Sequence, residues 1–118
     1  MTLIQKWRVY LADLDPVVGS EQGKRRPVMV VSDDALNTVL NVVNVLPITT
    51  RKPGRRVYPN EVLIGVGEAG LPNESIVLCH QIRTLDKQRL IKNYGKLTNS
   101  SQQEAVHEAL RFQLGIYR

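Results

Sequence analysis

Two adjacent arginines, Arg25 and Arg26, stand directly before a proline and a short apolar run, Val28 to Val31. They follow a polar, glycine-rich segment that begins at Asp13. This segment is too long for a tight hairpin, which usually needs about two to five residues. An arginine guanidinium is permanently charged, and its planar fork binds two phosphate oxygens at once. The arrangement therefore predicts a phosphate site where a long loop enters a buried strand.

A second cationic segment runs from residue 51 to residue 58. Its charged and aromatic members are Arg51, Lys52, Arg55, Arg56 and Tyr58. Proteins that bind single-stranded nucleic acids combine such cations with aromatic rings on which bases stack. The segment predicts a substrate-binding loop, and a loop whose charges only face solvent is the alternative.

The apolar run from Ser75 to Ile82 is interrupted by His80 and Gln81. An unperturbed histidine titrates near pH 6.5, so His80 is a candidate proton donor or acceptor. The alternative is a histidine that only makes hydrogen bonds at a strand edge. Cys79 is expected to be a buried strand residue, with the His80 side chain on the opposite face of the strand. A Cys–His nucleophile is therefore not expected.

The chain is expected to form one domain, residues 1–118, with a sizeable core. Its net charge of +5 favours an anionic partner, either a nucleic acid or an acidic protein. A single cysteine, no secretion signal and no long apolar run predict a cytoplasmic protein without a membrane partner. With two histidines and no clustered carboxylates, no metal or other cofactor is expected.

Strand-like runs alternate with turn signals along most of the chain. The expected strands cover residues 7–12, 28–31, 42–49, 61–64, 75–82 and 92–97. In the first of them Trp7, Val9 and Leu11 are expected to face the core of a half-buried strand. Pro47 cannot donate a ladder hydrogen bond, so the third strand must carry a bulge or lie beside an edge there.

Helical segments are expected at three places. Short turns follow Ser32 or Asp33, through residues 35–37, and Asp86, through residues 87–89. A long C-terminal helix is expected to begin with a capping box formed by Ser101 and Glu104 and to end at Gly115.

The apolar residues of this C-terminal helix cover more than one stripe, so the excess is expected to pack against a second copy of the chain. They are Ala105, Val106, Ala109, Leu110, Phe112 and Leu114. His107 is expected to be exposed and inert. Together the elements predict a mainly β, α+β fold: a small curved sheet or partly closed barrel with short helical turns and a C-terminal helix.

Three motifs resemble those of the MazF/PemK toxin family, the ribonuclease members of bacterial toxin–antitoxin pairs. They are the segment from Asp13 to Val31, the strand from Leu46 to Thr50, and the segment from Ser75 to Leu90. The resemblance covers nearly the whole chain and implies an SH3-like barrel and a homodimer. It also implies a sequence-specific, metal-independent endoribonuclease that cleaves single-stranded mRNA and leaves a 2′,3′-cyclic phosphate and a 5′-hydroxyl. An acidic cognate antitoxin of the MazE type would inhibit it.

The resemblance also implies roles for particular residues. Arg26, just before the proline of the second strand, would stabilise charge on the phosphate, and Thr49 would position it by a hydroxyl hydrogen bond. His80 stands where relatives usually carry an acidic residue and would be the third catalytic residue. Gln81 would orient the substrate or hold the loop. The candidate substrate-binding residues are Ser20, Glu21, Gln22, Arg25, Arg51, Lys52, Arg55, Arg56, Tyr58 and Gln81.

Two other functions fit a basic barrel of this size. The first is a gyrase-poisoning toxin of the CcdB type, which relies on a tryptophan before a C-terminal Gly-Ile pair. Here Leu114 precedes Gly115 and Ile116, and the only tryptophan is Trp7. The second is a nucleic-acid-binding barrel without catalysis. An RNA cleavage assay in EDTA separates all three.

Overall fold

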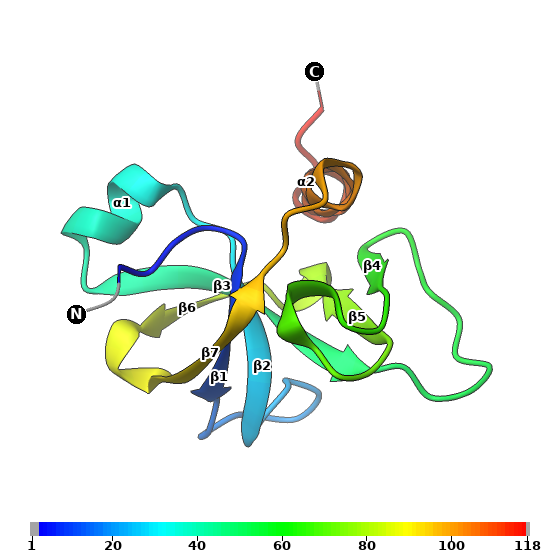
Figure 1. Ribbon diagram of the computed structural model, residues 1–118, viewed down its shortest axis with the longest axis horizontal. Coiled ribbons are helices and arrows are strands. Elements are labelled where there is room, and N and C mark those ends of the chain that lie inside the picture. The colour runs from blue at the N-terminus through cyan, green and yellow to red at the C-terminus, as the bar shows by residue number, and fades with distance from the viewer. Residues whose placement is uncertain (1–2, 118) are drawn as a thin grey trace.

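The computed structural model describes residues 3–117, which form a strongly curved antiparallel sheet with a helix against one side (Figure 1). The strands are β1 (Arg8–Asp13), β2 (Arg25–Val30), β3 (Val42–Thr50), β4 (Glu61–Ile64), β5 (Ser75–Leu78), β6 (Arg83–Asp86) and β7 (Leu90–Lys96). The helices are α1 (Asp34–Val39) and α2 (Ser100–Leu114), and the short 3₁₀ turns are η1 (Glu68–Gly70), η2 (Cys79–Gln81) and η3 (Lys87–Arg89). This confirms the predicted mainly β fold with short helical turns and a C-terminal helix.

The long strand β3 organises the sheet, whose strand order is β4-β5-β3-β2-β1-β7. One edge of β3 pairs with β2, and its other edge pairs first with β6, through residues 42–45, and then with β5, through residues 48–50. Pro47 lies between the part of β3 that pairs with β6 and the part that pairs with β5. Its lack of a backbone N–H therefore breaks no continuous run of hydrogen bonds along that edge. The irregularity predicted at Pro47 is therefore a change of partner strand.

The sheet carries a hydrophobic core on both faces. Val9 and Met29 belong to a cluster under α2, whereas Tyr10 and Val28 belong to a second cluster on the other face. Successive side chains of a strand point to opposite faces, so neighbouring residues enter different cores. The expectation of a half-buried first strand was therefore wrong: Tyr10 is buried, and Leu11 is only half-buried.

The predicted strand over residues 75–82 is also wrong. β5 ends at Leu78, the turn η2 follows, and the chain re-enters the sheet as β6 at Arg83. Cys79 is fully buried as expected, and burial raises the pKa of its thiol to about 12. His80 is exposed, so the two side chains share no site, but a turn rather than strand alternation separates them.

The helix α2 begins two residues before the predicted position. Its N-cap is Asn99, whose side-chain oxygen accepts a hydrogen bond from the backbone N–H of Gln102 at 3.1 Å. Ser101 therefore lies inside the first turn rather than at the cap. Gly115 ends the helix in the left-handed region, with φ of 66°, as predicted. The predicted caps Asp33 and Asp86 are also confirmed.

His107 was wrongly expected to be exposed, whereas its lack of a role in the reaction stays a prediction. It is half-buried, because the segment before β1 covers it: its Nε2 lies 3.0 Å from Lys6 Nζ, and its ring centroid lies 5.0 Å from that of Trp7. Within residues 3–117, no helix has both the length and the apolar character that a membrane crossing requires.

Candidate active site

Arg26 and Thr49 lie on neighbouring strands. β2 begins at Arg25, so both arginines belong to the strand and pair with β1, rather than ending the loop as predicted. β2 and β3 pair Val28 with Pro47, and this register extended by two residues places Arg26 opposite Thr49. Strand pairing thus brings together two residues that are far apart in the sequence.

The side chains of Arg26 and Thr49 line one cavity of about 200 Å³. Arg25 and Thr50 line it as well, and the described residues around it include no carboxylate. Arg26 is half-buried, and its Nε donates a hydrogen bond of 3.1 Å to the Gly23 carbonyl oxygen. Neither arginine forms an ion pair with a carboxylate among residues 3–117. A cavity with uncompensated guanidinium groups and hydroxyls is suited to a phosphate.

Gln81 ties the turn η2 to the long first loop. Its Oε1 accepts a hydrogen bond from the Gln22 backbone N–H at 2.7 Å, and its Nε2 donates to the Ser20 carbonyl oxygen at 3.1 Å. Gln81 was expected either to orient the substrate or to hold the loop, and these contacts support the second role. The loop is also closed at its base, where Asp15 accepts from the Lys24 backbone N–H at 2.7 Å.

His80 does not line the cavity of Arg26 and Thr49. It borders an open cavity of about 490 Å³ with Ser20 and Glu21, and another of about 500 Å³ with Arg55 and Tyr58. The structure therefore brings together two of the three predicted catalytic residues. His80 lies where these two open cavities adjoin.

The role of His80 can be tested by pH. If its imidazole exchanges a proton during cleavage, the rate constant of the wild type should show an inflection with pH, measured from weakly acidic to weakly basic buffers. The His80→Gln variant should lack that inflection. Single-turnover rate constants of the two proteins are measured across this range. Identical pH–rate profiles would show that His80 takes no part in the proton transfer.

The cations of the loop between β3 and β4 divide into two groups. Arg55 forms two hydrogen bonds, of 2.9 and 2.8 Å, with the carboxylate of Glu61, whose side chain is only 3% exposed. These bonds lower the pKa of Glu61. Arg51 forms a salt bridge of 3.3 Å with Glu74. Arg55 therefore ties the loop to the start of β4, and Arg51 ties it to the residue before β5.

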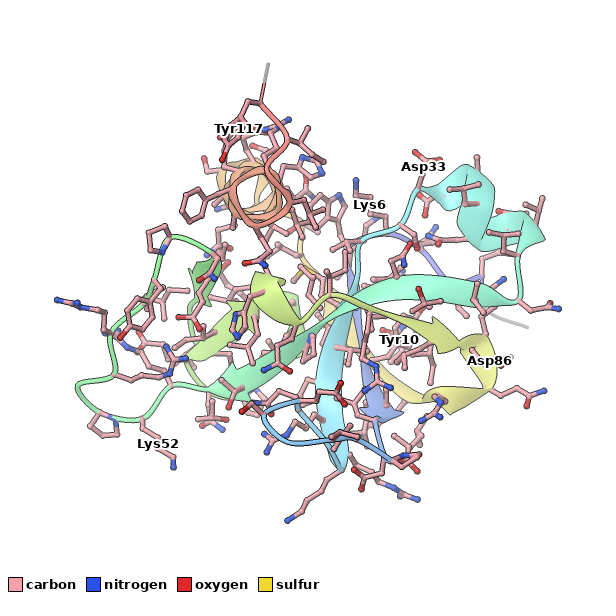
Figure 2. All side chains as sticks on the ribbon, turned by 180° about the vertical axis from the view of Figure 1, so that it is seen from behind. Lys6, Tyr10, Asp33, Lys52, Asp86 and Tyr117 are labelled. Atoms are coloured by element: carbon pink, nitrogen blue, oxygen red, sulfur yellow. The ribbon has the colours of Figure 1, made fainter. Side chains whose placement is uncertain are left out.

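Lys52 and Arg56 are the exposed cations of this loop, and neither has a carboxylate partner in the described part of the chain. Lys52 extends away from the body of the protein (Figure 2). The Arg56 guanidinium lies 5.9 Å from the centroid of the exposed Tyr58 ring. This pair offers a charge for a phosphate and a ring for a base.

Neutralising both exposed cations should weaken RNA binding. For the double variant Lys52→Gln, Arg56→Gln, the slope of log affinity against log salt should fall by about 0.7 for each lost phosphate contact. Arg51 and Arg55 are left intact because their loss would disturb the loop. Lys96→Gln removes one exposed charge elsewhere and is the control. Titrations with a labelled single-stranded RNA measure the slope, and an unchanged slope would show that the loop charges only face solvent.

The absence of a metal from the reaction stays a prediction. Across residues 3–117, no three histidine, cysteine, aspartate or glutamate side chains gather as in a metal site.

Comparison with known proteins identifies the family. A family model described as the PemK-like, MazF-like toxin of type II toxin–antitoxin systems matches residues 5–114. The chain belongs to this family. This PemK/MazF-like toxin is 38% identical over 114 residues to "Endoribonuclease EndoA" of Bacillus subtilis (strain 168), an alignment that covers 97% of each chain.

Solved structures agree with the fold of this toxin. MazF from Deinococcus radiodurans superposes with a TM-score of 0.82 at 27% identity, covering 98% of this chain and 100% of that one. An endoribonuclease from Mycobacterial species, solved in complex with its cognate antitoxin, superposes with a TM-score of 0.78 at 26% identity, covering 98% of both chains.

Sequence reasoning missed part of the wall of the Arg26 cavity in this toxin. Asn73, just before β5, and Tyr94, from β7, both line it. Neither lies in any of the three motifs: Asn73 precedes the third motif, and Tyr94 lies beyond it. Their approach depends on how η1 packs against β7, for which the sequence carries no periodic signal.

Proposed function

We propose that this toxin is an endoribonuclease that cleaves single-stranded mRNA in the cytoplasm, without a metal and at specific sequences. The observation that carries the proposal is the cavity in which Arg26 and Thr49 meet without a neighbouring carboxylate. Membership of the PemK/MazF-like family and the endoribonuclease name of the Bacillus subtilis relative support it.

The proposed reaction is an internal transfer of the phosphate. The 2′-oxygen of one nucleotide attacks the adjacent phosphorus, and the bond from phosphorus to the 5′-oxygen of the next nucleotide breaks. The 2′-hydroxyl loses its proton and the leaving 5′-oxygen gains one, so the products are a 2′,3′-cyclic phosphate and a 5′-hydroxyl. No metal or cofactor takes part.

Each residue of the site has a separate task in this reaction. The two terminal nitrogens of Arg26 donate to phosphate oxygens whose charge grows as the bond forms. The Thr49 hydroxyl holds one of these oxygens in place. His80 accepts the proton of the 2′-hydroxyl and returns a proton to the leaving 5′-oxygen. This requires it to reach the scissile nucleotide when RNA is bound, because it lines other cavities in the free protein.

Cleavage of a long RNA in the presence of EDTA tests the proposal. We expect cuts at a restricted set of sequences and new 5′ ends that accept phosphate from polynucleotide kinase without phosphatase treatment. Loss of cleavage in EDTA would contradict the metal-free reaction. No cleavage in any buffer would favour the CcdB-like or purely binding alternatives, which a gyrase supercoiling assay and an RNA titration then separate.

We further propose that the toxin acts as a homodimer and that an acidic cognate antitoxin of the MazE type holds it inactive. The net charge of +5 and the cavity without carboxylates favour a partner that lays its own carboxylates near Arg25 and Arg26. The mycobacterial relative solved with its cognate antitoxin supports this partnership.

A further inference from the structure

Tyr94 supplies an aromatic ring to the cavity that holds Arg26 and Thr49. It comes from β7, at the far edge of the sheet from β3. It is the only aromatic residue among those that line this cavity in the described part of the chain. A phosphate site beside an aromatic ring is the arrangement by which proteins hold one nucleotide of a single strand.

A bulge in β7 directs Tyr94 toward this cavity. In the pairing of β1 with β7, Val9 lies opposite Gly95 and Tyr10 lies opposite Asn93, so Tyr94 has no partner. A bulge changes the direction of a side chain, and bulges are common beside active sites. Regular alternation would have given this side chain a different orientation.

The backbone of η1 holds Tyr94 in position. Gly70 has a φ of +74°, and a Cβ built on it would lie 2.1 Å from the Tyr94 carbonyl oxygen. A Cβ on Gly95 would lie 2.9 Å from the backbone of Ala69. The two backbones therefore touch directly, which is possible only with glycine at both positions. This contact fixes the backbone of Tyr94 next to the segment that leads from η1 into β5.

The surroundings of the ring suit a nucleobase. Tyr94 is half-buried, and its hydroxyl makes no hydrogen bond with any described residue. Lys92 Nζ lies over the ring, 5.7 Å from its centroid, although Lys92 is not among the residues that line the cavity. The side-chain amide of Asn73, in the same wall, has no hydrogen-bond partner within residues 3–117, so it is available to a base edge.

We infer that Tyr94 stacks on the base of a nucleotide adjoining the scissile phosphate, while Arg26 binds that phosphate and Asn73 faces the edge of the base. This subsite rests on the proposed RNA cleavage and adds to it a residue that selects and aligns the substrate. The ligand is a single-stranded nucleotide unit, recognised by its ring and its phosphate together.

The experiment compares three proteins on matched RNAs. Tyr94→Leu keeps apolar bulk but removes the ring, Tyr94→Phe keeps the ring, and the wild type is the reference. Once the cleavage site is mapped, each protein is tested on a short RNA of that sequence and on two versions with an abasic residue on one or the other side of the cut. Single-turnover rates are measured, and thermal unfolding checks that all three proteins are folded.

On intact RNA, Tyr94→Leu should be slower than wild type by about 10- to 100-fold, the range expected for losing one base stack, whereas Tyr94→Phe should stay within about threefold of it. On one of the abasic RNAs, wild type and Tyr94→Leu should cleave at equal rates. A wild-type rate for folded Tyr94→Leu, an equal loss in Tyr94→Phe, or the same loss on both abasic RNAs would overturn the subsite. If the wild type cuts no RNA, it is the proposed function that fails.

Discussion

The variant Arg26→Ala is expected to cleave RNA at least about 100-fold more slowly than the wild type. Losing one oriented donor to a developing negative charge has an effect of roughly this size in other enzymes. The fold should persist, because the backbone pairing of position 26 with Ala12 does not need the side chain, whose described hydrogen bond is a single one to Gly23. Single-turnover rates and thermal unfolding measure the two effects separately.

Neighbouring substitutions serve as controls for this result. Arg25→Ala removes the same charge from an exposed position, and Thr49→Ala removes one hydroxyl, so both should reduce the rate by a smaller factor. Arg26→Lys keeps the charge but loses the planar fork, and it should lie between alanine and the wild type. A folded Arg26→Ala protein with undiminished cleavage would falsify the assignment of this cavity as the active site.

The variant Leu114→Asp is expected to turn a dimer into a monomer and to lower cleavage as the dimer is lost. Val106 and Ala109 are the buried residues of α2, whereas Phe112 and Leu114 are 54% and 53% exposed. A second copy related by a two-fold axis would cover this apolar surface and would bring the same residue to the interface from both subunits. Each substitution therefore places two carboxylates at one contact.

The structure makes Leu114 the better site for this test than Leu110, because Leu110 packs against the core and its loss would also weaken the fold. Val39→Asp, on the exposed side of α1, is the matched control and should leave assembly and activity unchanged. Sedimentation at micromolar concentration, followed by cleavage assays on the same samples, gives the result. A fully active wild-type monomer would contradict the proposed dimer.

Local patterns predicted most of the fold but not where one strand ends. The strand over residues 61–64 and the helix end at Gly115 follow directly from apolar runs and glycine chemistry. The end of β5 at Leu78 could not be predicted in this way, because Cys79 is as fully buried as the strand residues before it. An apolar pattern records burial, and a buried turn has the same pattern as a buried strand.

In the candidate site, too, some residues could be predicted from local sequence and others only from the fold. Motif resemblance reached both Arg26 and Thr49, and the pairing of β2 with β3 explains why they meet, although the predicted strand began only at residue 28. The charges of the second loop were harder to interpret, because whether Arg55 is available depends on Glu61, which the fold buries beside it. Tyr94 depends on a bulge and on a contact between two backbones, and neither leaves a pattern in the sequence.

The change of partner along β3 has a consequence for the part of the chain opposite it. The register of β3 and β5, extended by one residue, places Leu78 opposite Pro47, which has no N–H to offer, and β5 ends there. Between Val77, opposite Ile48, and Arg83, opposite Val45, five residues span a distance that two residues cover on β3. The surplus equals the length of η2, the turn that carries His80 and Gln81. Pro47 in β3 thus lies opposite the point where β5 ends and the turn η2 loops out of the sheet. This turn exposes the imidazole of His80 to solvent, and through Gln81 it holds the first loop in place.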